Sequence, residues 1–124
     1  MNKKVTYVKG QLNCAESIID SFNKNNNTEI PVALGSGMGT GATIGSLCGA
    51  VNAAVLVIGY LKGRETYQEE NKARSLANDL LKEIKNKFNS ELCVDLKKSN
   101  VSCSEIVSFT YEKLEEILSK NGSN

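Results

Sequence analysis

The chain has 124 residues, of which 40% are hydrophobic and 23% are charged, and its formal net charge is +1. This length is enough for one core, so we expect a single globular domain over residues 1–124. Lys and Glu are interleaved with no basic stripe, which argues against a nucleic-acid partner, and the absence of histidine excludes Cys–His or Ser–His nucleophile pairs and histidine metal ligands.

The N-terminal part of the chain predicts one amphipathic helix. Residues 3–9 are expected to form a short helix or an extended segment. Asn13 then has the character of a helix N-cap, and Glu16 stands where the acid of a capping box belongs. Hydrophobic residues follow at helical spacing, and we expect the helix to end in a polar loop over residues 23–27.

A glycine-rich and then apolar stretch occupies the middle of the chain. Residues 28–34 predict either a small helix or an edge strand, and a ladder of glycines follows from Gly35 to Gly45. No charged residue occurs between Glu29 and Lys62, so this stretch should be buried on all sides. We expect a loop that leads into a central apolar helix over about residues 45–61.

The central apolar segment is also the one candidate for a membrane span. Its length falls short of the ~20 residues that a span needs, and it contains Asn52 and several glycines. We therefore predict a buried core helix and no membrane span.

The second half of the chain predicts further helices. Residues 64–88 show the clearest pattern, with one apolar face and an opposite face of Lys and Glu. Residues 91–98 predict a short helical turn, and Ser102 with Glu105 forms a second capping box before a last amphipathic helix. The sequence thus predicts an all-α fold, a small bundle of about five helices around the central helix at about 45–61.

Four cysteines are the residues most able to carry chemistry. Their spacing contains no C-x-x-C pair, so neither a thioredoxin motif nor a zinc ribbon is indicated. Each is predicted at or near the first turn of a helix, where unpaired backbone N–H groups and the helix dipole favour thiolate over thiol. Thiolate is the form that ligates metals and attacks disulfides, so four such cysteines could form a reactive or metal-binding site. The alternative interpretation is that the cysteines are packing residues that fill the core. The four are Cys14, Cys48, Cys93 and Cys103.

The glycine ladder fits the spacing of a dinucleotide-binding fingerprint, but neither the flanking strands nor a G-K-[ST] sequence is present. We therefore do not expect nucleotide binding. Instead, Gly37, Gly39 and Gly49 are predicted to surround a cofactor, where the lack of a side chain lets backbone N–H groups approach cluster sulfurs or an anion. A loop threaded tightly between helices is the alternative.

The order and context of the cysteines resemble a known family. Asn13-Cys14-Ala15-Glu16-Ser17, Gly35-Ser-Gly37-Met-Gly39 and Cys48-Gly49-Ala50, followed by two later cysteines, are similar to the C-GCAxxG-C-C family of redox-active proteins, which are small bacterial and archaeal domains. The family motif ends in Gly where this chain has Ala53. The resemblance implies a redox role and assigns it to Cys14, Cys48, Cys93 and Cys103.

We expect an electron-transfer protein whose four cysteines converge and ligate an iron–sulfur cluster, with [2Fe–2S] preferred. A zinc ion would use the same four ligands. A thiol–disulfide relay without metal, pairing Cys93 with Cys103, is the second hypothesis, and a non-redox helical binding module with structural cysteines is the third.

Two further expectations concern the protein's surroundings. The start of the chain lacks the apolar region of a signal peptide, which predicts a cytoplasmic protein with reduced thiols. A central helix this apolar in so short a chain also allows a homodimer. The sequence identifies neither a redox partner nor a substrate.

Overall fold

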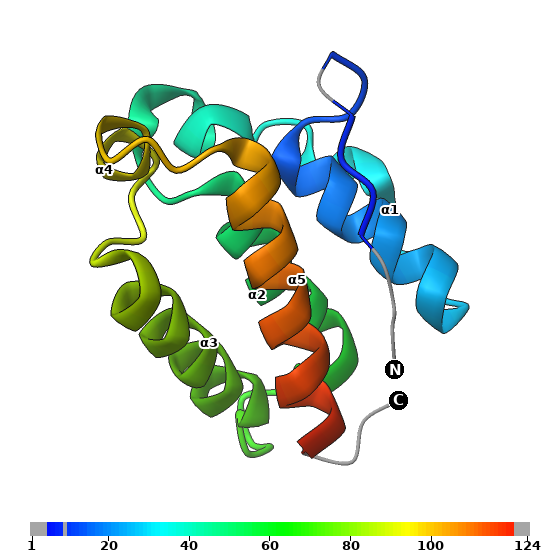
Figure 1. Cartoon of the computed structure of the whole chain (residues 1–124). Helices are drawn as coiled ribbons and strands as arrows, with labels where there is room; N and C mark the ends of the chain where they lie inside the picture. The colour runs from blue at the N-terminus through cyan, green and yellow to red at the C-terminus, as the bar shows by residue number, and fades with distance from the viewer. Residues whose placement is uncertain (1–4, 9, 121–124) are drawn as a thin grey trace.

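The computed structural model describes residues 5–8 and 10–120, and this part of the chain forms an all-α bundle (Figure 1). The central helix α2 packs against α1, α3 and α5, whereas the short α4 lies at one end of the bundle. The prediction of an all-α bundle around a central apolar helix is confirmed. The helices are α1 (Cys14–Asn26), α2 (Gly49–Lys62), α3 (Lys72–Phe88), α4 (Cys93–Lys98) and α5 (Cys103–Lys120).

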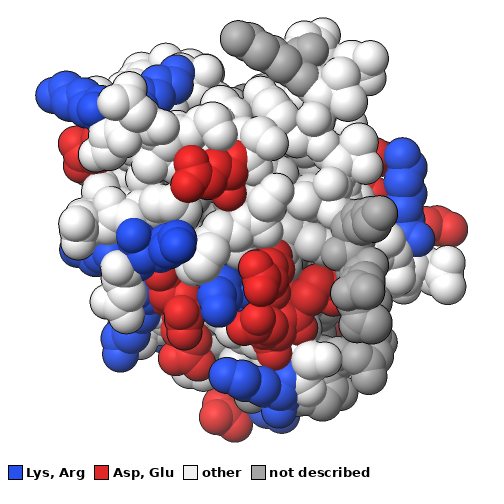
Figure 2. All heavy atoms as spheres, in the orientation of Figure 1, with Lys and Arg blue, Asp and Glu red and all other residues white. Residues whose placement is uncertain are grey.

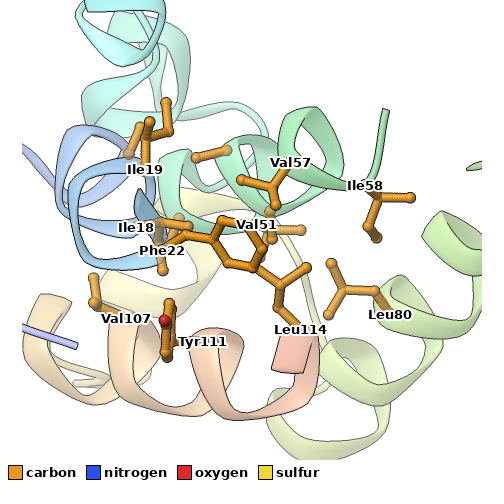
Figure 3. Close-up of a cluster of buried hydrophobic side chains, with 14 of the residues drawn as sticks. Ile18, Ile19, Phe22, Val51, Val57, Ile58, Leu80, Val107, Tyr111 and Leu114 are labelled. Atoms are coloured by element: carbon orange, nitrogen blue, oxygen red, sulfur yellow. The ribbon is translucent and has the colours of Figure 1, made fainter. Parts of the chain in front are cut away.

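The core lies between these helices. Figure 3 shows buried side chains from α1, α2, α3 and α5 pointing toward one another, and each of those named below is at most 2% exposed. Burying an aliphatic or aromatic side chain of this size contributes about 1.5–3 kcal/mol, so this shared cluster is what holds the bundle together. Its members include Ile18 and Phe22 of α1, Val51 and Val57 of α2, Leu80 of α3 and Leu114 of α5.

The glycine-rich stretch is tightly folded backbone, not the first turn of the central helix. It forms a 3-10 turn, η1 (Val32–Gly35), and a π-type turn, η2 (Gly41–Gly45), so α2 begins at Gly49 and not near residue 45. The four residues Thr40 to Thr43 all have positive φ, from 54° to 72°. A left-handed conformation costs about 1–2 kcal/mol for each residue that is not glycine.

Hydrogen bonds across the turn hold this unfavourable backbone in place. The Ser46 N–H donates to the Gly41 carbonyl oxygen at 2.8 Å, and the Ala42 N–H donates to the Met38 carbonyl oxygen at 3.0 Å. The surrounding structure therefore imposes the left-handed turn on the chain.

The predicted helix over residues 64–88 begins later than expected, at Lys72. Asn71 starts it by accepting a hydrogen bond from the Arg74 N–H at 3.3 Å. The preceding loop is exposed and is held by the Arg64 guanidinium, which donates to two carbonyl oxygens of the loop at 3.3 Å each. The loop is as rich in charged residues as the exposed face of the helix, so no change in charge pattern marks the boundary.

Other boundaries also differ from the sequence-based expectation. The polar run at 23–27 is mostly the last turn of α1, which ends at Asn26 with Asn27 in the left-handed conformation. Residues 28–34 contain no strand, since their regular structure is η1. Residues 5–8 are extended or irregular, and residues 3, 4 and 9 of the predicted segment lie outside the described residues.

The surface mixes both signs of charge. On the face drawn in Figure 2, Lys and Arg alternate with Asp and Glu without a stripe of one sign. Within residues 5–8 and 10–120, no helix combines the length and the apolar character needed to cross a bilayer.

Asn13 joins the start of α1 to the glycine-rich stretch. Its side-chain oxygen accepts from the Glu16 N–H at 2.7 Å, and the Glu16 carboxylate accepts from the Asn13 N–H at 2.8 Å, so the predicted capping box is confirmed. The Asn13 amide also donates to the carbonyl oxygens of Gly35 and Ser36, at 3.2 Å each. One side chain thus caps a helix and tethers a loop.

We expect Asn13→Ala to destabilise the protein by about 2–3 kcal/mol, because a lost N-cap costs about 1 kcal/mol and two loop carbonyls lose their donor. The matched control is Asn71→Ala, which removes the cap of α3 and should cost only about 1 kcal/mol. Urea unfolding followed by circular dichroism measures both. Equal losses for the two variants would contradict the tethering role of Asn13.

Candidate thiol site

The four cysteines stand at the starts of four helices. Cys14, Cys93 and Cys103 are the first residues of α1, α4 and α5, and Cys48 is the N-cap residue of α2. All four line one cavity of about 50 Å³, although they are spread over most of the sequence. The remaining lining residues are Thr40, Gly49, Leu96, Lys97, Val101 and Ile106.

The four thiols differ in burial. Cys14 and Cys48 are 9% and 4% exposed, Cys93 is partly buried, and Cys103 is exposed. All four are free thiols. The site therefore has an inner pair, Cys14 and Cys48, and an outer pair, Cys93 and Cys103.

The thiols of the inner pair share a hydrogen bond. This bond from Cys48 is the largest influence on Cys14 and lowers the pKa of its thiol to about 6, against the opposing effect of burial. The backbone N–H groups of Ala50 and Ala15 lower the same pKa further. The pKa of Cys48 is raised, first because its proton is held by Cys14 and second because the thiol is buried. At neutral pH the pair is thus a Cys14 thiolate that accepts from a protonated Cys48.

The outer pair behaves differently. Burial raises the pKa of the Cys93 thiol, the Lys97 ammonium group lowers it, and the charges of Cys14 and Cys103 raise it. The expectation that a helix start favours the thiolate is therefore met at Cys14 but not at Cys93. At Cys93 the rise in pKa caused by burial outweighs the lowering by the Lys97 ammonium group.

A short pairing of extended backbone sets the inner pair beside the outer pair. Leu47 and Leu92 form an isolated antiparallel bridge. Next to it, the Cys48 N–H donates to the Glu91 carbonyl oxygen at 2.9 Å, and the Cys93 N–H donates to the Ser46 carbonyl oxygen at 2.7 Å. These bonds hold the start of α2 against the start of α4.

Of the three glycines predicted to surround a cofactor, Gly49 lines the cavity. A Cβ atom there would lie 2.6 Å from the Met38 carbonyl oxygen and 2.9 Å from the Cys14 sulfur. Gly39 packs against the side chain of Asn13, next to Cys14. Gly37 is exposed and has no atom within 4 Å of its Cβ position, so it makes no contact with the cavity.

Sequence reasoning missed three residues near the thiols. Thr40 and Lys97 line the cavity, and Tyr7 lies close to Cys103. The pKa of Tyr7 is raised, first by burial and then by a hydrogen bond with Cys103. No motif marks these positions, because they come together only through the packing of the N-terminal segment, α4 and the left-handed turn.

The positions of the possible ligand side chains limit the kind of metal site that they could form. Within residues 5–8 and 10–120, no group of three or more His, Cys, Asp or Glu side chains is placed to hold one metal ion. The thiols instead form an inner and an outer pair around one cavity.

Replacing the donor of the inner pair should shift the titration of Cys14. In the reduced, metal-free protein we expect a thiolate to form with a pKa of about 6. Cys48→Ala should move this pKa upward, since the hydrogen bond that stabilises the thiolate is lost, whereas Cys48→Ser retains a donor and should move it less. The ultraviolet absorbance of thiolate against pH measures the change, with Cys14→Ser identifying the transition. Identical transitions in the Ala and Ser variants would refute the shared hydrogen bond.

The close packing at Gly49 gives a second prediction. Gly49→Ala should destabilise the protein by about 1–3 kcal/mol, because the new methyl group overlaps Met38 backbone and the Cys14 sulfur. Gly59→Ala in the same helix meets no atom within 4 Å and should stabilise by about 0.5–1 kcal/mol. Urea unfolding of both variants checks the pair. A Gly49→Ala variant as stable as Gly59→Ala would show that the close approach is unimportant.

One known protein family matches most of this chain. The chain matches the model of the family described as "Putative redox-active protein (C_GCAxxG_C_C)" over residues 12–117. No curated protein and no solved structure matches the chain. The family match covers all four cysteines and most of the sequence, and it confirms the resemblance seen in the motifs. The chain belongs to this C_GCAxxG_C_C family.

Proposed function

We propose that this redox-active protein is an electron carrier in which Cys14, Cys48, Cys93 and Cys103 ligate an iron–sulfur cluster. The observation that carries the proposal is that all four thiols line one small cavity. Four cysteine thiolates are the usual ligand set of [2Fe–2S] and [4Fe–4S] clusters, and this chain has no histidine to replace any of them.

The pairing of the thiols supports a two-iron cluster in particular. In a [2Fe–2S] centre each iron takes two protein ligands, so an inner and an outer pair suit it without three donors converging on one ion. A four-cysteine zinc site, the alternative with the same ligands, needs all four thiolates around one ion. When bound, the cluster would supply a centre that takes up and releases single electrons.

The chain's own residues would prepare such a centre. Cys14 is already a thiolate at neutral pH, so it needs no base to become a ligand. The N-terminus of α2 and the Lys97 ammonium group offset negative charge at the thiolates. Burial of Cys14 and Cys48 keeps water from the inner side, while Cys103 faces solvent and offers the shortest route for an electron.

The same proposal includes a cellular compartment, an oligomeric state and an electron partner for the protein. Reduced thiols are maintained in the cytoplasm, which is where we place the protein. Tyr60 of α2 is 53% exposed beside the half-buried Val55 and Leu56, and this apolar surface supports a homodimer. The electron partner is a further redox protein or small molecule.

Anaerobic purification tests the cluster. We expect a brown protein with about two iron and two acid-labile sulfide per chain and with visible absorption bands. Cys14→Ser and Cys103→Ser should each abolish or strongly alter the bands, whereas Ser108→Ala, at an exposed position of α5, should leave them unchanged. A colourless protein that contains zinc, or iron binding that survives loss of two cysteines, would overturn the proposal.

One observation favours a second candidate, a thiol–disulfide protein. A low-pKa thiolate hydrogen-bonded to a neighbouring thiol, as in Cys14 and Cys48, is the arrangement of a reactive dithiol. Oxidation would join the two sulfurs and pass two electrons and the Cys48 proton to an acceptor such as a low-molecular-weight disulfide, which takes a second proton from water and is thereby reduced to two thiols. The structure thus favours Cys14 with Cys48 over the Cys93–Cys103 pair expected from the sequence.

Thiol counting separates the two candidates in metal-free protein. The dithiol hypothesis predicts that mild oxidation removes two thiols and that peptide mapping finds Cys14 linked to Cys48. Four thiols remaining after oxidation would exclude it, whatever the outcome for iron.

A further inference from the structure

A second, larger cavity adjoins the thiol site. It has a volume of about 610 Å³ and lies where the end of α4, the following loop and the start of α5 face the N-terminal segment. A volume between about 300 and 1,000 Å³ is typical of sites for cofactor-sized molecules. The lining residues are Tyr7, Lys97, Asn100, Val101, Ser102, Cys103 and Ser104.

The two cavities share part of their lining. Lys97, Val101 and Cys103 line both of them. A molecule in the larger cavity would therefore lie next to Cys103, which also lines the cavity of the other thiols. This places the larger cavity where electrons would leave or enter the site.

The walls of the larger cavity are fixed by hydrogen bonds. On one side, the Thr6 N–H donates to Ser21 Oγ of α1 at 2.9 Å and so holds the segment that carries Tyr7. On the other side, the Val101 N–H donates to the Leu96 carbonyl oxygen at 2.9 Å, and the Asn100 N–H donates to the Lys97 carbonyl oxygen at 3.1 Å. The cavity is thus built before any ligand arrives.

The charge of the lining selects for an anion. Lys97 is the one charged residue among the lining residues, which include no carboxylate. The nearest acid of α4, Asp95, accepts a hydrogen bond from Ser90 at 2.8 Å, and the exposed Glu105 lies outside the lining. The positive end of the 18-residue helix α5 also opens at the cavity, since Ser102, Cys103 and Ser104 line it.

The lining also suits a molecule with an apolar body. Tyr7 and Val101 are both partly buried against the core and offer aromatic and aliphatic surface. Asn100, Ser102 and Ser104 supply hydrogen-bonding groups beside them. A ligand with a ring system and an anionic group would use both kinds of surface.

We propose that this cavity binds a small anionic, ring-containing redox molecule that exchanges electrons with the thiol site, with Lys97 at its anionic group and Tyr7 at its ring. The proposal deepens the proposed electron-carrier function by naming the class of partner at its exposed edge. With a cluster held by the four thiols, the bound molecule would gain the electron that the cluster loses, or the reverse, and no bond would form between them.

The test is direct binding to the full chain as purified under anaerobic conditions, with flavin mononucleotide and an anthraquinone sulfonate as probes. At least one probe should bind saturably, and binding should weaken with added salt because of the ionic contact. Lys97→Gln should weaken binding about tenfold, and Tyr7→Leu, which keeps an apolar side chain, should weaken it severalfold. Lys98→Gln is the matched control, since Lys98 is exposed and lies outside the lining.

Binding that is absent for both probes, or equally strong in Lys97→Gln and Lys98→Gln, would overturn the proposal. Circular dichroism of each variant checks that the fold is retained. Because binding is measured independently of metal content, the two proposals fail separately. Iron-free protein that binds a probe would contradict only the cluster, and iron-containing protein that binds neither probe would contradict only this site.

Discussion

Where α2 begins, there is room for a hydrogen atom but not for a side chain, because the Met38 carbonyl oxygen and the Cys14 sulfur occupy the space around Gly49. This contact brings the start of α1 against the start of α2 and puts the Cys14 and Cys48 thiols within hydrogen-bonding reach. The rest of the site is arranged around that contact. The bridge at Leu47 adds α4 with Cys93, and the packing of α5 on α2 adds Cys103.

Two opposing effects set the state of each thiol. A helix start stabilises a thiolate, whereas burial away from water destabilises it. At Cys14 the hydrogen bond from Cys48 adds to the backbone N–H groups, and together they outweigh burial. At Cys48 the same bond favours the protonated form, and at Cys93 burial exceeds the effect of Lys97. Similar positions on helices therefore produce dissimilar thiols, and a site with one preformed thiolate results.

Local signals in the sequence were sufficient for the helices and for the start of α1, but not for the starts of α2 and α3. The capping box of Asn13 and Glu16 and the apolar face of the later helix are short-range patterns, and both appear as predicted, although α3 starts eight residues later than its charge pattern suggested.

The left-handed turn at Thr40 to Thr43 was not predictable, because Thr and Ala disfavour positive φ and only tertiary packing imposes it. The placement of Tyr7 beside Cys103 and the exposure of Gly37 depend likewise on contacts between distant segments. The roles of the four cysteines in redox chemistry stay a prediction.

The thiols at the two ends of the set, Cys14 and Cys103, enclose about 90 residues of chain between them, which is most of the protein. A cluster held by all four thiols, or a covalent link between Cys14 and Cys103, would close that length of chain into a loop. Restricting an unfolded chain in this way is worth about 4–5 kcal/mol for a loop of that size, which is comparable to the whole stability of many small domains. Filling the cavity in this way would therefore make the bundle harder to unfold.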